Sequence, residues 1–106
     1  MSASQNLIIT EEKQGSELRV SLEGHLDRLT SPELDSRMSD EYLAGFTKVV
    51  FDLEKLEYLS SAGLRVFLRI DNLMDEKDGM IITHANPVIM DIFEICGFTE
   101  IMTIEP

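Results

Sequence analysis

The sequence is short of cysteine and of long apolar runs, and both shortages limit what the protein can be. Its 106 residues include one cysteine, Cys96, and no tryptophan. A single cysteine cannot form a disulfide within the chain, which fits a reducing compartment. There is no secretory leader and no apolar run of about 18 residues, so the sequence predicts a soluble protein of the cytoplasm.

Basic residues are also scarce. The chain has 9 lysines and arginines against 20 aspartates and glutamates, which gives a net charge of -11. Nucleic acids and anionic membranes attract proteins through basic surfaces, so neither is expected as a direct partner. A partner with a basic face would associate faster, although the simpler interpretation is that the acidity keeps a small protein soluble.

The first half of the chain predicts a hairpin, a helix and a strand within one domain, residues 1–106, whose first six residues are expected to be frayed. Residues 7–13 and 15–24 predict the hairpin, because Leu18, Val20 and Leu22 alternate with polar side chains, which is typical of a strand. Residues 30–45 predict a helix with Ser31 as N-cap, Pro32 after it and Gly45 as its stop. Residues 48–59 begin with a continuous apolar run, which predicts a strand buried on both faces.

The second half predicts two more strand and helix pairs. Residues 60–77 carry one apolar stripe at helical spacing, with Arg65 and Arg69 on the outer side. Residues 80–85 predict a strand, and Asn86 and Pro87 then open a helix that Gly97 ends. Cys96 lies on the apolar side of this helix and is expected in the core. Residues 100–105 predict a last strand.

The element order β β α β α β α β predicts an α/β fold, a mixed sheet of about four to five strands covered by helices. Right-handed crossovers around the two middle helices make the strands before them parallel. The serine pair in "EYLSSAGLR", Ser60 and Ser61, then lies at the carboxyl end of a central strand. Ligands and reactive groups of open sheets gather at that edge.

The residues offer little support for catalysis by these serines. A nucleophile needs a base, and His25 or His84 can approach the same edge, but the glycines of the motif G-x-S-x-G are absent. The segment "SSAG" lacks the lysine of a phosphate-binding loop. Two scattered histidines and one cysteine do not have the spacing of metal ligands. We therefore expect no catalytic residue, no metal, no cofactor and no enzymatic activity.

Two roles stay open for the serine pair. A serine before a helix caps an unpaired backbone N–H. A serine at a helix N-terminus can also carry a phosphoryl group, whose charge the helix dipole favours. Gly63 would let another chain approach closely, and Arg65 and Arg69 would balance the added charge. Spacing alone allows both roles.

Three segments, "GHLDRLTSPEL", "KVVFDLEKLEYLSSAGLRVFL" and "GMIITHANPVIMDIFEICGFTEIM", together resemble the STAS domain, specifically a stand-alone bacterial anti-sigma-factor antagonist. The resemblance implies a protein that binds an anti-sigma factor serine kinase while unphosphorylated. Serine phosphorylation then releases it, and a phosphatase resets it, which regulates sigma-factor-dependent transcription. An alternative is a STAS module without phosphorylation, as a scaffold or a subunit of a transport or lipid-trafficking complex.

The resemblance also implies a site. In the family motif Asp-Ser-Ser-Gly-Leu the first serine is the acceptor, and alignment on Gly63 and Leu64 makes this Ser61. Ser60 replaces the aspartate of the motif and stays a rival acceptor or a cap. Asp27, flanked by His25 and Arg28, matches the loop beside the acceptor in the partner interface. The implied partner-binding residues are Asp27, Arg28, Ser60, Ala62, Gly63, Leu64 and Arg65.

Overall fold

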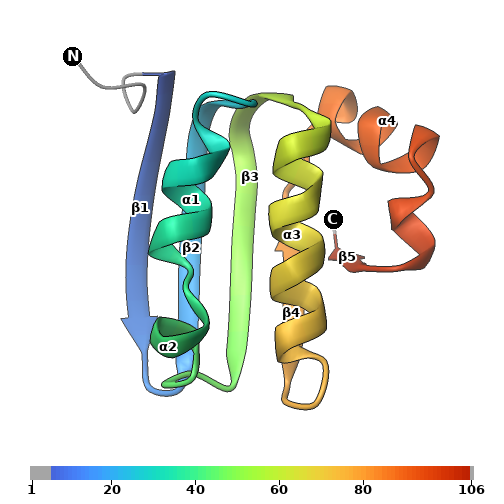
Figure 1. Cartoon of the computed structure of the whole chain (residues 1–106). Helices are drawn as coiled ribbons and strands as arrows, with labels where there is room; N and C mark the ends of the chain where they lie inside the picture. Colours follow the sequence, from blue (N-terminus) through green and yellow to red (C-terminus); the bar gives the residue numbers. More distant parts are fainter. Residues whose placement is uncertain (1–5, 106) are drawn as a thin grey trace.

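A computed structural model describes residues 6–105 and shows a five-stranded sheet with helices packed on it (Figure 1). The strands, in the order β1-β2-β3-β4-β5, are β1 (Leu7–Gln14), β2 (Glu17–Leu26), β3 (Lys48–Leu59), β4 (Gly79–Thr83) and β5 (Thr103–Glu105). β1 pairs antiparallel with β2, and the other neighbours are parallel. The predicted mixed sheet is confirmed. The frayed end predicted for residues 1–6 falls, apart from Asn6, outside the described residues.

The helices are α1 (Ser31–Arg37), α2 (Asp40–Leu43), α3 (Ser61–Met74) and α4 (Pro87–Ile95), followed by a 3-10 turn, η2 (Phe98–Glu100). α1, α2 and α3 lie over the same face of the sheet (Figure 1). β2 alternates accordingly between buried apolar residues and exposed or half-buried ones, and β3 buries Val49, Phe51 and Leu53 in the same core. The opposite face carries polar side chains that include Ser21, Glu23, Asp52 and Glu54.

The single helix predicted for residues 30–45 is wrong, because the chain forms two helices there. The backbone leaves the helical conformation at Met38 (φ -102°, ψ 47°), and Ser39 caps α2 by accepting the Tyr42 N–H. Ser31 is not the N-cap: Thr30 holds that position, and the Ser31 side chain is buried. Gly45 does lie just past the helix end, as predicted, because α2 ends at Leu43 and Ala44 is its C-cap.

β3 was expected to be buried on both faces, and this is confirmed only for its first part, where Val49, Val50 and Phe51 are all buried. Val49, Phe51 and Leu53 point into the core, whereas Glu54 is exposed. The inward residues then follow at intervals of three, Leu56 and Leu59. Two register shifts against β2 explain the change, since each inserts one extra residue into β3 and turns the next leucine inward.

One hydrophobic core joins the sheet to α3 and α4. The Phe67 ring on α3 meets Phe51 on β3 edge-on, with centroids 5.0 Å apart, and lies 6.3 Å from the Phe93 ring on α4. The predicted stripe of α3 is confirmed, since its apolar residues from Val66 to Met74 are buried or half-buried.

The carboxyl-terminal part departs from the prediction in two places. Cys96 is exposed and not in the core, because α4 ends at Ile95 and Cys96 is its C-cap. Gly97 follows with φ 76°, a left-handed conformation that ends the helix as predicted. The last strand is shorter than predicted, because residues 98–100 form the 3-10 turn.

Candidate functional site

The serine pair lies where β3 ends and α3 begins, at the predicted sheet edge. Ser60 is the N-cap of α3, and its Oγ accepts a long hydrogen bond of 3.5 Å from the Gly63 N–H. Its backbone N–H donates to the Leu26 carbonyl at 2.9 Å, which ties the loop to β2. Ser61 is the first residue of α3 and is exposed, without a side-chain hydrogen bond to any of residues 6–105. The Ser60 hydroxyl therefore caps the backbone of α3, whereas the Ser61 hydroxyl is exposed and not engaged in a hydrogen bond with any described residue.

Gly63 and Leu64 form the inner side of this loop. A Cβ added to Gly63 would lie 2.7 Å from Leu59 Cδ1 and 2.8 Å from Leu26 Cγ. Within the chain, Gly63 therefore allows the close approach of Leu59 and Leu26 to the start of α3. Leu64 is only 5% exposed. Gly63 and Leu64 are therefore buried under the loop and position it. Neither residue is exposed for contact with a partner.

Asp27 shapes the neighbouring loop, which follows β2. Its Oδ1 accepts hydrogen bonds from the backbone N–H groups of Leu29 (2.9 Å) and Thr30 (3.0 Å). The Thr30 hydroxyl in turn donates to the His25 carbonyl at 2.7 Å. Burial pushes the Asp27 pKa upward, but the hydrogen bonds from Thr30 and Leu29 outweigh it and hold the pKa below its usual value. The carboxylate therefore fixes this loop in its ionised form.

A groove between α1 and α3 opens beside the two loops, with a volume of about 370 Å³. Its lining residues are Arg28, Ser31, Pro32, Asp35, Ala62, Arg65, Val66 and Arg69. The structure thus brings Arg28, Ala62 and Arg65, three of the predicted partner-binding residues, to one surface. Arg28 and Arg65 are exposed.

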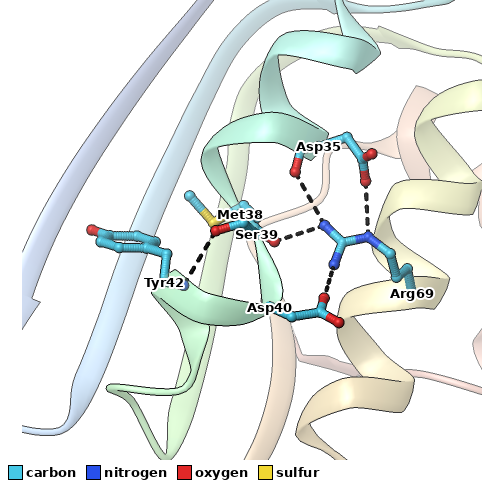
Figure 2. Close-up of polar contacts among 6 residues, drawn as sticks. All are labelled: Asp35, Met38, Ser39, Asp40, Tyr42 and Arg69. Atoms are coloured by element: carbon cyan, nitrogen blue, oxygen red, sulfur yellow. Dashed lines mark hydrogen bonds and ion pairs between the residues drawn. The ribbon is translucent and has the colours of Figure 1, made fainter.

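Arg69 was expected to face solvent, but the structure shows that it joins α3 to α1 and α2 (Figure 2). Its guanidinium pairs with Asp35 at 2.9 Å and with Asp40 at 2.8 Å. It also donates to the Met38 carbonyl at 2.6 Å and to the Asp35 carbonyl at 3.2 Å. Carbonyls at the end of α1 lack helical partners, so Arg69 supplies donors where the helix breaks.

The histidines make other contacts than those a nucleophilic serine needs. His25 Nε2 lies 3.3 Å from Glu57, and His84 Nδ1 lies 3.4 Å from Asp52. Neither forms a hydrogen bond with Ser60 or Ser61. Within residues 6–105 no three His, Cys, Asp or Glu side chains gather as metal ligands would. None of the described helices is both long and apolar enough to cross a membrane.

Sequence reasoning missed three contributors to this surface. Thr30 and Ser31 were expected only as a helix start, yet both are buried, and Ser31 lines the groove. Leu29 is 64% exposed between them and Asp27. Leu29 is an apolar residue within a polar loop, and this was the signal that the sequence offered. It was overlooked because the helical pattern that follows accounted for the segment.

The chain is similar in sequence to known regulatory proteins. A family model described as "Mlab, STAS domain" matches residues 9–104. The anti-sigma F factor antagonist of Paenibacillus polymyxa is 31% identical over 101 residues, which cover 93% of this chain and 86% of that protein. The anti-sigma-B factor antagonist of Staphylococcus aureus is 29% identical over 98 residues, 92% of this chain and 91% of that one.

Solved structures agree on the fold. An anti-sigma factor antagonist from Mycobacterium paratuberculosis superposes with a TM-score of 0.86 at 21% identity, over 100% of this chain and 91% of that one. The antagonist SpoIIAA in its unphosphorylated form gives a TM-score of 0.78 at 18% identity, over 93% of this chain and 89% of that one. With the family model matched along nearly its whole length, the chain belongs to the STAS domain family.

Proposed function

We propose that the protein is an anti-sigma factor antagonist that changes partners through phosphorylation of Ser61. Unphosphorylated, it binds an anti-sigma factor that is also a serine kinase, which frees the sigma factor for transcription. The phosphorylated form is released, and a phosphatase restores the binding form. The names of the relatives support the antagonist role, and the geometry of the serine pair supports Ser61 as the switch.

The choice of Ser61 rests on one observation: the two serines differ in role, since Ser60 caps α3 and Ser61 is exposed. Ser60 is only partly exposed, and its Oγ already accepts the Gly63 N–H as the cap of α3, so it is less accessible to a kinase than Ser61. Ser61 is exposed at the same helix N-terminus, where the dipole favours an added anion. In the transfer, Ser61 Oγ forms a bond to the γ-phosphorus of ATP, the bond to the β-phosphate oxygen breaks, and ADP leaves. The serine proton passes to a base of the kinase.

The docking surface consists of Asp27, Arg28, Ser60, Ala62 and Arg65 around the acceptor, with Gly63 and Leu64 beneath it. A phosphoryl group adds a charge of about -1.5 to -2 at pH 7 in the middle of this surface. Within an interface such a charge is repelled by acidic groups or loses its water, and either effect weakens the complex. One covalent change can therefore switch the partner.

We further propose that residues 1–106 form a single domain that works in the cytoplasm and has no catalytic activity of its own. The kinase supplies the magnesium ion, the base and the nucleotide, so the antagonist needs only an accessible hydroxyl on a rigid support. Ser61 at the start of a packed helix provides this.

The test is to incubate the protein with its cognate kinase and ATP and to measure the intact mass. We expect one phosphoryl adduct in the wild type and in Ser60→Ala, and none in Ser61→Ala. An adduct that persists in Ser61→Ala would exclude Ser61 as the acceptor. The alternative, a STAS scaffold or a subunit of a transport or lipid-trafficking complex, predicts no adduct and co-purification with the proteins of such a complex.

A further inference from the structure

The groove between α1 and α3 is lined by three arginines, although the chain as a whole is strongly acidic. Arg28 and Arg65 form no ion pair with any carboxylate of residues 6–105, although the chain contains 20 acidic residues. The third arginine of the groove, Arg69, is bound to Asp35 and Asp40. A protein of net charge -11 thus leaves two guanidinium groups free on one surface.

The same groove contains an unsatisfied polar group. Ser31 lines it and is 4% exposed, and its Oγ has no hydrogen-bond partner among the described residues. Buried hydroxyls nearly always have a partner, and an unpaired one destabilises the fold. A donor without a partner, beside two free arginines, is what an anion with several oxygens would satisfy.

The position of Ser61 relative to Arg65 connects the acceptor to this groove. Arg65 follows Ser61 by four residues in α3, so the two share one face of the helix. Side chains of a helix lean toward its N-terminus, which directs the Arg65 guanidinium back toward Ser61. The corresponding residue for Ser60 is Leu64, which is buried. A group on Ser61, and not one on Ser60, therefore has an arginine within reach.

We propose that the groove between α1 and α3 is an anion site that receives the phosphoryl group of Ser61 within the same molecule. The phosphoryl oxygens accept from Arg65 and Arg28, with the Ser31 hydroxyl as an additional donor. Asp35 also lines the groove, but Arg69 neutralises its charge. The captured phosphoryl group withdraws both free arginines from the docking surface, which adds to the release of the partner. This inference rests on the proposed function, because it concerns the phosphorylated form.

The test uses phosphoserine inserted at position 61 during translation, so it requires no kinase. The second pKa of phosphoserine, ordinarily about 6, is measured by ³¹P NMR as a function of pH. Two guanidinium groups stabilise the dianion, so we expect a lower pKa in the otherwise wild-type protein. Arg65→Gln should raise that pKa by about 0.5 to 1, and Arg28→Gln should raise it as well.

Two controls separate local capture from net charge. Lys55→Gln removes one positive charge from outside this groove and should leave the pKa unchanged. Phosphoserine at position 60 should not respond to Arg65→Gln. Equal shifts in Arg65→Gln and Lys55→Gln, or no shift in Arg65→Gln, would overturn the inference. Failure of a kinase to modify Ser61 would instead refute the proposed function and leave this measurement unaffected.

Discussion

Replacement of Gly63 by alanine tests how tightly the junction between β3 and α3 is packed. The new methyl group would lie 2.7 Å from Leu59 Cδ1 and 2.8 Å from Leu26 Cγ, closer than carbon atoms normally approach. Leu26 is fully buried and Leu59 is 3% exposed, so neither has free space to move into. Overpacking of this kind costs about 1 to 3 kcal/mol. Alanine is the better helix former by about 1 kcal/mol, so the net loss should be about 1 kcal/mol.

Urea unfolding of Gly63→Ala measures this loss, and Gly45→Ala is the matched control. A Cβ at Gly45 meets only the Tyr42 carbonyl oxygen, at an ordinary 3.6 Å, and Gly45 is not left-handed. We expect Gly45→Ala to be neutral or to stabilise the protein by up to about 1 kcal/mol. Gly63→Ala should therefore lower the urea concentration at the unfolding midpoint, whereas Gly45→Ala should raise it or leave it unchanged.

A double-mutant cycle identifies the cause. Leu26→Ala alone should cost about 2 to 5 kcal/mol because it opens a cavity. In that background the methyl group introduced at position 63 has room, so Gly63→Ala should cost less than in the wild type, with a coupling above about 0.5 kcal/mol. If Gly63→Ala raises stability by the helix-propensity gain, or if the two changes simply add, the packing argument is refuted.

Three further outcomes are expected. Arg69→Gln should lower the free energy of unfolding by about 1 to 3 kcal/mol, because two exposed ion pairs and two bonds to helix-end carbonyls are lost; urea unfolding that matches the wild type would contradict this. The pKa of Asp27 lies below its usual 3.8, so its ionised form stabilises the fold above that pH and the benefit disappears as pH falls through the folded pKa. The stability difference between wild type and Asp27→Asn should therefore shrink in acid, and a difference that grows there would show the opposite sign. The exposed thiol of Cys96 should react with Ellman's reagent in the native protein, and protection until denaturant is added would place it in the core instead.

Much of the fold was predictable because its signals are local. The alternation in β2 and the helical stripe of α3 arise from neighbouring residues that must share one buried face. The cap pair Asn86 and Pro87 was equally readable, and Asn86 does accept the Ile89 N–H. These features need only the period of an element and the chemistry of its first turn.

Other features depend on partners that are distant in the sequence. The helix break at Met38 is held by Arg69, 31 residues further along, and no local pattern contains that contact. The bulges of β3 exist only in its pairing with β2. Cys96 has the spacing of a core residue, but α4 ends at Ile95, and Cys96 is exposed at its C-cap.

The site shows the same division. Ser60, Ser61, Gly63 and Leu64 are consecutive or nearly so, and the sequence by itself placed them at a strand end before a helix and linked them to a family. That Ser60 is a cap, Ser61 an exposed residue, and Gly63 and Leu64 packing residues appears only in the folded chain. The groove of Arg28, Ser31 and Arg65 likewise required α1 to lie against α3. Local periodicity determined the elements, whereas long-range packing decided which side chains are buried or bonded within the fold and which stay exposed.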